Sequence, residues 1–94
     1  MEKQFVVVAY DVSDDRRRER LHHLLEGYGT PVQYSVFECW LGRREKEKVQ
    51  RSVRRIIRRE VDQVRYYLLC GQCWKRIEVE GRGEVHRLEE VVIV

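Results

Sequence analysis

A nearly continuous apolar run, rich in β-branched side chains, spans residues 4–10 and stops at Asp11. Such a run is typical of a β-strand that is covered on both of its faces. The chain has 94 residues, which is one small domain with a thin core of its own. This strand must therefore find cover outside a single small core, and a second copy of the chain is the simplest source.

The spacing of apolar residues beyond this strand predicts two helices and further strands. Ser13, Asp14 and Asp15 have the residue types of a helix start, and leucines at helical spacing follow over residues 15–28. The other predicted elements are an extended region over 32–41 with a bend or tight hairpin near Phe37–Cys39, a helix over 44–60, and strands over 63–70, 76–79 and 90–94.

The order β-α-β(β)-α-β is that of an α+β, ferredoxin-like βαββαβ sandwich, here as one domain over residues 1–94 with an extra C-terminal strand. In this plan two helices cover one face of an antiparallel sheet and leave the other face open. We expect the open face to form a homodimer. We also expect the strand at about 90–94 to pair with the partner protomer, because an apolar strand with a free edge promotes aggregation.

The positive charge of the chain is concentrated in one segment. Residues 43–59 carry nine basic and two acidic side chains, or +7, although the whole chain is only +3. Guanidinium groups pair well with phosphate, so this segment is either a solvated helix face or a stripe that binds a duplex without reading its bases. The arginines that share one helical face are Arg44, Arg51, Arg54, Arg55 and Arg58.

The sequence argues against a membrane span and against secretion. No stretch reaches the roughly 18 apolar residues that a membrane span needs. The N-terminal residues lack the pattern of a secretory signal. The chain has three cysteines, a low and odd number that argues against a disulfide framework. We therefore expect a reducing, cytoplasmic setting without membrane contact.

Asp11 is the most informative candidate for chemistry. It stands at the carboxyl end of a buried strand and just before a helix, where it either caps the loop or presents a reactive carboxylate. Magnesium usually takes one or two carboxylates together with water and substrate phosphate. One Asp11 is a poor site, but Asp11 and its symmetry mate in a two-fold dimer could share one magnesium ion or another divalent cation.

The start of the first helix carries both acids and bases. Asp14 and Asp15 are typical first-turn helix charges. Among the arginines that follow, some are expected to pair with these acids, while others, Arg16 and Arg17 among them, could neutralise phosphate.

Cys70 and Cys73 form one C-x-x-C pair late in the chain. They are either ordinary thiols or part of a metal or redox site, although zinc usually needs four ligands. His22, His23 and His86 show no ligand spacing and are expected at the surface.

Two blocks of sequence resemble the Cas2 family of CRISPR-associated proteins. The first runs from Tyr10-Asp11-Val12 to Arg18, and the second runs from Val32-Gln33 to Glu38. Leu21, Gly29, the Leu69–Cys73 segment and the terminal Val91–Val94 run also match, in the expected order and at the expected length.

This resemblance implies a homodimer that binds duplex DNA and bridges the CRISPR integrase during spacer acquisition. It also implies a magnesium-dependent endonuclease acting on single-stranded RNA or duplex DNA, with Asp11 as the metal-binding aspartate. The other residues that match positions tied to this activity are Tyr10, Arg18, Arg20 and Phe37.

The sequence departs from the family pattern at Pro31, where many members have Arg. Proline offers a substrate neither a charge nor a hydrogen-bond donor. The departure therefore bears on the implied nuclease activity more than on the implied role in spacer acquisition. The alternatives are a ribonuclease toxin of a related fold and a non-catalytic nucleic-acid-binding module. The second should present stacking aromatics on one sheet face, whereas Tyr66 and Tyr67 are adjacent and are expected on opposite faces.

Overall fold

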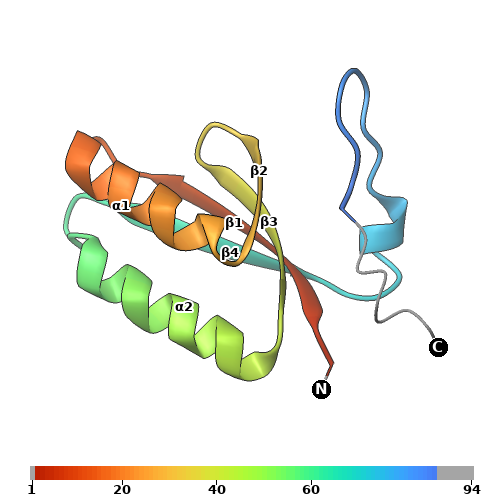
Figure 1. Cartoon of the computed structure of the whole chain (residues 1–94), viewed down its shortest axis with the longest axis horizontal. Helices are drawn as coiled ribbons and strands as arrows, with labels where there is room; N and C mark the ends of the chain where they lie inside the picture. The colour runs from red at the N-terminus through yellow and green to blue at the C-terminus, as the bar shows by residue number, and fades with distance from the viewer. Residues whose placement is uncertain (1, 87–94) are drawn as a thin grey trace.

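The computed structural model describes residues 2–86 and has one four-stranded antiparallel sheet with two helices. Its elements in chain order are β1 (Gln4–Asp11), α1 (Asp15–Glu26), β2 (Gly29–Gln33), β3 (Val36–Leu41), α2 (Arg43–Ile56), β4 (Gln63–Leu69) and the 3₁₀ turn η1 (Trp74–Arg76). The strand order β2-β3-β1-β4 is that of the predicted ferredoxin-like sandwich (Figure 1).

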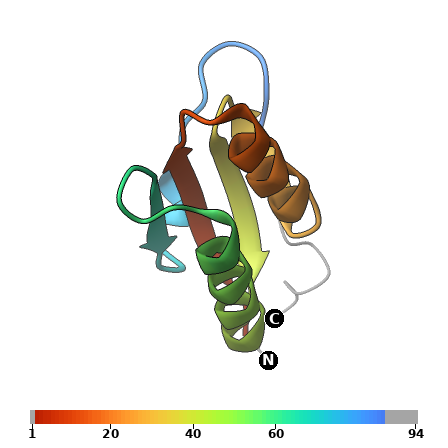
Figure 2. The same cartoon turned by 90° about the vertical axis from the view of Figure 1, so that its left-hand side faces the viewer.

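Both helices lie on the same side of the sheet (Figure 2). Alternate residues of β1, including Val6 and Val8, point toward the helices and are fully buried. They pack with Leu21 and Leu25 of α1 and with Val49 of α2 in a single core cluster. Residues of β1 on the other face, such as Val7 and Ala9, are only partly buried, so one face of the sheet is largely open as predicted.

The hairpin between β2 and β3 turns earlier than expected. Its turn is at Tyr34 and Ser35, where Ser35 adopts a φ of 69°. Strand β3 is continuous from Val36 to Leu41, and its pairing with β2 shifts register once, between Pro31 and Gln33. The prediction of a bend near Phe37–Cys39 was therefore wrong. Ser35 is neither Gly nor Asn, so its left-handed conformation gave no signal in the sequence.

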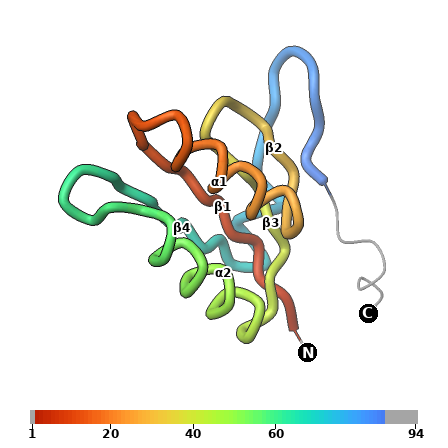
Figure 3. The backbone as a smooth tube through the Cα atoms, turned by 60° about the vertical axis from the view of Figure 1, so that its left-hand side comes forward, coloured from red at the N-terminus to blue at the C-terminus, as the bar shows by residue number. Residues whose placement is uncertain are grey.

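Two further boundaries differ from the expected ones. Helix α2 ends at Ile56 rather than at residue 60, because Ile57 is extended and the Arg58 amide donates to Asp62 Oδ2 at 2.8 Å. The expected strand over 76–79 is absent from the described part of the chain. Trp74–Arg76 form η1 instead, and residues 77–86 form an irregular loop (Figure 3) that returns to the sheet at His86, whose carbonyl oxygen accepts from Trp40 Nε1 at 3.0 Å.

An aromatic cluster covers one end of the open face. Phe5 and Trp40 are cross-strand neighbours whose ring centroids are 5.1 Å apart. Trp74 stacks on Phe5 at 6.2 Å and meets Trp40 edge-on at 4.9 Å, so Phe5 is only 1% exposed. The predicted strand at about 90–94 lies outside the described residues.

Gly29 begins β2 where two backbones come close together. A Cβ atom there would lie 2.4 Å from Cys39 Sγ and 2.5 Å from the Glu38 carbonyl oxygen. Glycine is therefore needed at this position, because only a residue without a side chain lets β2 pair so closely with β3.

Candidate active site and nucleic-acid interface

Asp11 is the last residue of β1 and is exposed. It pairs with Gln63 at the start of β4, and the alternation of the strand places it on the open face, away from the helices. The carboxylate therefore stands at one end of the surface that was predicted to meet a second protomer.

Arg18 braces the loop that follows Asp11. Its guanidinium donates to the carbonyl oxygens of Val12 and Ser13, at 2.9 and 3.2 Å, and it also forms an ion pair with Asp15. These contacts hold the pKa of Arg18 above its usual value, chiefly through the hydrogen bond to Asp15. Arg18 thus connects the first turn of α1 to the backbone beside the candidate carboxylate.

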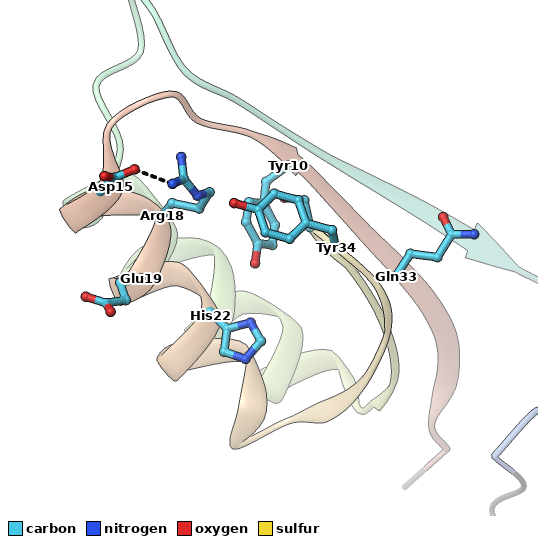
Figure 4. Close-up of a pocket in the computed structure, with 8 residues that line it drawn as sticks. Tyr10, Asp15, Arg18, Glu19, His22, Gln33 and Tyr34 are labelled. Atoms are coloured by element: carbon cyan, nitrogen blue, oxygen red, sulfur yellow. Dashed lines mark hydrogen bonds and ion pairs between the residues drawn. The ribbon is translucent and has the colours of Figure 1, made fainter. Parts of the chain in front are cut away.

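A cavity of about 410 Å³ lies between α1 and the β2–β3 hairpin, on the helix side of the sheet (Figure 4). Arg18 lies 5.8 Å from the centroid of the Tyr34 ring, and Tyr34 is 79% exposed at the tip of the hairpin. The residues that line this cavity are Tyr10, Asp15, Arg18, Glu19, His22, Gln33, Tyr34 and Ser35.

Tyr10 and Phe37 are placed on the helix side of the sheet, not beside Asp11. Tyr10 is buried, and burial raises the pKa of its hydroxyl above the ordinary value. Phe37 is fully buried and packs edge-on against His22, with ring centroids 5.1 Å apart. A role for Phe37 in any chemistry would thus be one of positioning.

The two arginines before Arg18 have different surroundings. Arg16 is exposed, as is Arg20 on the same helix. Arg17 instead makes a two-point ion pair with buried Asp62, with Nε–Oδ2 at 2.7 Å and Nη2–Oδ1 at 3.2 Å. This pair joins α1 to the loop between α2 and β4, and a phosphate could reach the Arg17 guanidinium only in competition with Asp62.

The basic face of α2 is exposed. Arg44, Arg51, Arg54 and Arg55 point away from buried Val49 and Val53. Arg58, which was placed on the same stripe, lies just beyond the end of the helix and is also exposed. These five exposed guanidinium groups could pair with phosphates, which gives affinity for a duplex without sequence preference.

The structure brings together only part of a metal site. Within residues 2–86 there is no group of three His, Cys, Asp or Glu side chains that could hold a metal ion. Asp14 caps α1 by accepting from the Arg17 amide at 3.0 Å, and Asp15 is paired with Arg18. One protomer therefore supplies the Asp11 carboxylate alone, which is the smallest number of the one or two carboxylates that magnesium usually takes beside water and substrate phosphate.

The tyrosines of β4 are arranged as predicted. Tyr66 packs against the core on the helix side, while Tyr67 is 47% exposed on the open face. Tyr66 and Tyr67 therefore do not form the stacking platform that an RNA-binding module presents on one sheet face.

Sequence reasoning missed Asp62 and the lining residues Tyr34 and His22. The partner of Asp62 is 45 residues away in the sequence, so no local pattern indicates the pair. For Tyr34 the sequence held one signal, because a tyrosine that precedes a turn residue is not expected to be buried.

In the part of the chain that is described, no helix is long and apolar enough to cross a membrane.

Comparison with known proteins gives a consistent result. A family model described as "CRISPR associated protein Cas2" matches residues 4–77. The chain is 42% identical over 88 residues to a protein of Synechocystis sp. named CRISPR-associated endoribonuclease Cas2 3, with 94% of this chain and 96% of the relative covered. It is 43% identical over 94 residues to a Thermus thermophilus protein named CRISPR-associated endonuclease Cas2 2, with both chains fully covered.

Solved structures agree with these sequence matches. Streptococcus pyogenes Cas2 is similar with a TM-score of 0.74 and 33% identity, over 82% of this chain and 99% of that one. A chain of a structure titled "Partial Cas6-RT-Cas1--Cas2 complex" is similar with a TM-score of 0.74 and 25% identity, over 97% and 99% of the two chains.

Proposed function

The chain belongs to the Cas2 family of CRISPR-associated proteins, and from that premise we propose that it acts in spacer acquisition as a homodimer that binds duplex DNA and bridges copies of a Cas1 integrase. The observation that carries the proposal is the family match over residues 4–77. The likeness to a chain from a structure titled as a Cas1–Cas2 complex supports the choice of partner.

The open sheet face supports the homodimer. Val7 and Ala9 in β1 and Tyr67 in β4 lie on it without a covering helix, and Tyr67 is a large side chain that is 47% exposed on the edge strand β4. A chain of this size buries too little surface alone to leave such a face in water without cost. A second copy placed there would bring two Asp11 residues toward a common axis.

A divalent cation would then be held by the paired Asp11 carboxylates. Such an ion supplies charge neutralisation at a scissile phosphate and a more acidic bound water. The chain's own contribution is to fix the two carboxylates. Arg18 does so through the carbonyls of Val12 and Ser13, while exposed Arg16 and Arg20 approach the phosphate backbone. Pro31 on β2 offers no charge of its own to the substrate.

Asp11→Ala separates a pure scaffold from a protein with its own chemistry. A scaffold keeps dimer formation, DNA binding and spacer acquisition in this variant. Loss of acquisition with the dimer and DNA binding intact would show that the carboxylate itself is needed.

Cleavage is assayed with magnesium on single-stranded RNA and on duplex DNA, with Asp11→Asn beside the unsubstituted protein. We expect the variant to cleave about a hundredfold more slowly, which is the size of effect that follows the loss of a group that stabilises the transition state. Equal cleavage by both proteins would assign the activity to a contaminant.

A further inference from the structure

The segment that joins β4 to η1 holds two exposed cysteines close together. The backbone amides of Cys73 and Trp74 both donate to the Cys70 carbonyl oxygen, at 3.0 and 3.1 Å. This tight turn places the Sγ atoms of Cys70 and Cys73 3.3 Å apart. From this geometry we propose that Cys70 and Cys73 form a thiol–disulfide exchange site whose substrates are low-molecular-weight disulfides such as oxidised glutathione.

The two sulfurs are already near bonding distance. A disulfide holds its sulfurs about 2.05 Å apart, so the pair must approach by only roughly 1.3 Å. Both side chains are exposed, and the turn that holds them is short. A small rotation of the side chains is therefore enough, and the sheet need not move.

The two thiols are not equivalent. The hydrogen bond between the two thiols is the largest cause that lowers the pKa of Cys70, and the backbone amides of Cys73 and Gln72 add to it. The same interaction raises the pKa of Cys73. Because the thiolate is the attacking species, Cys70 reacts first and Cys73 resolves the intermediate.

The exchange balances without a further oxidant. The Cys70 thiolate attacks one sulfur of oxidised glutathione, which forms a Cys70–glutathione disulfide and releases one glutathione thiolate. Cys73 loses its proton and attacks Cys70 Sγ, which forms the Cys70–Cys73 bond and releases the second glutathione. The protein loses two hydrogen atoms, and the small disulfide becomes two thiols.

Zinc is the competing occupant of a C-x-x-C pair. A structural zinc site needs four ligands, and the described residues contain no third His, Cys, Asp or Glu grouped with these two. Cys39 cannot serve, because it is buried on the helix side of the sheet among core side chains. Its burial raises the pKa of the thiol to about 11, which makes it an unreactive internal reference.

The site is connected to the open face of the sheet. Cys73 directly precedes Trp74, whose indole stacks on Phe5 and meets Trp40. Closing the disulfide next to this indole should change tryptophan fluorescence, which gives a second readout that does not depend on mass.

The test uses the full-length, fully reduced protein and oxidised glutathione, followed by intact mass and peptide mapping. The proposal predicts loss of two hydrogen atoms and one Cys70–Cys73 bond, with a matching change in fluorescence. Cys73→Ser should trap glutathione on Cys70, and Cys70→Ser should react at least several-fold more slowly. Cys39→Ser should behave like the unsubstituted protein.

Three results would overturn the proposal. These are an unchanged mass after exposure, glutathione left on Cys70 and Cys73 separately without an internal bond, and stoichiometric zinc binding that needs both cysteines and blocks the exchange. Cys70 and Cys73 are exposed, so their variants should fold, and circular dichroism checks the fold of all three variants, including that of buried Cys39→Ser.

Discussion

At the scale of single residues, the ion pair between Arg17 and Asp62 has a structural role, which the abundance of arginine in the sequence does not indicate. Asp62 has a fully buried side chain that accepts two bonds from the Arg17 guanidinium and one from the Arg58 amide. The hydrogen bond from Arg17 is the main reason that the pKa of Asp62 is lowered. The pair fastens the first turn of α1 to the loop before β4.

Asp62→Asn should lower the free energy of unfolding by roughly 1–3 kcal/mol, the cost of leaving buried donors poorly paired. A lowered folded pKa means that the carboxylate stabilises the protein above the pKa of an unfolded aspartate, about 3.9. That contribution is lost as the pH falls through the lowered pKa. Urea unfolding of both proteins at several pH values measures the difference, which should shrink below about pH 4.

Glu60→Gln is the matched control, because it removes a nearby exposed carboxylate. It should change stability by less than about 0.5 kcal/mol at every pH. A difference between Asp62→Asn and the unsubstituted protein that stays constant down to low pH would contradict the role given to the charge.

Arg18 is a positioning residue for the loop after Asp11. Arg18→Lys keeps the charge but lacks the planar fork that reaches both the Val12 and Ser13 carbonyls. We expect cation-dependent cleavage to fall about tenfold, which is about 1.4 kcal/mol of barrier, while DNA affinity stays the same. Arg76→Lys on exposed η1 is the control. An equal loss of DNA affinity and cleavage would instead make Arg18 a simple phosphate contact.

At the scale of elements, β2 depends on a missing side chain. Gly29→Ala should destabilise the protein by roughly 1–3 kcal/mol, because the new Cβ would overlap Cys39 Sγ and the Glu38 carbonyl. Gly27→Ala is the matched control, since its Cβ would make only an ordinary 3.5 Å contact and its φ is −77°. Thermal unfolding of both variants measures the effect, and equal melting temperatures would contradict the close approach.

The arginines on the basic face of α2 should make the affinity for duplex DNA depend on salt concentration. Changing Arg51, Arg54 and Arg55 to Gln should weaken duplex binding at low salt for every sequence tested. The slope of log affinity against log salt should fall by up to about 3, because each phosphate contact contributes about 0.9. The paired change Arg76→Gln with Arg82→Gln, outside α1 and α2, should leave the slope nearly unchanged. An unaltered slope in the triple variant would mean that this face is only solvated.

Local patterns predicted some elements better than others. Strands β1 and β4 and the start of α1 follow from apolar spacing and from capping by Asp14. The β2–β3 turn did not, because Ser35 is left-handed without being glycine. Gly and Pro are residue types that are typical of a helix end, yet Gly29 and Pro31 both lie in β2, where pairing with β3 decides their conformation.

The candidate site was predictable only in part. Asp11 at the end of a buried strand could be found from its position alone. The face on which Tyr10 and Phe37 lie depends on strand alternation, and it places them on the side opposite Asp11. Asp62 depends on a contact between segments 45 residues apart, which no local pattern contains.

At the scale of the whole molecule, a single protomer has an open sheet face with the exposed carboxylate of Asp11 at one end of it. If two copies meet through that face, each copy covers the open sheet of the other, and the second Asp11 carboxylate is supplied by symmetry. The proposed unit is thus a two-fold dimer with a formal charge of +6, twice the +3 of one chain. Its two basic α2 faces would lie on the helix sides of the sheets, away from the interface (Figure 2).

The separation of the two Asp11 carboxylates in the assembled protein tests this account most directly. A crystal structure of the protein grown with magnesium gives the distance between the nearest carboxylate oxygens. The account predicts a two-fold dimer through the open face with a separation of roughly 4–5 Å, which suits one magnesium ion with metal–oxygen distances near 2.1 Å. A dimer through another surface, or carboxylates more than about 10 Å apart with magnesium present, would contradict it.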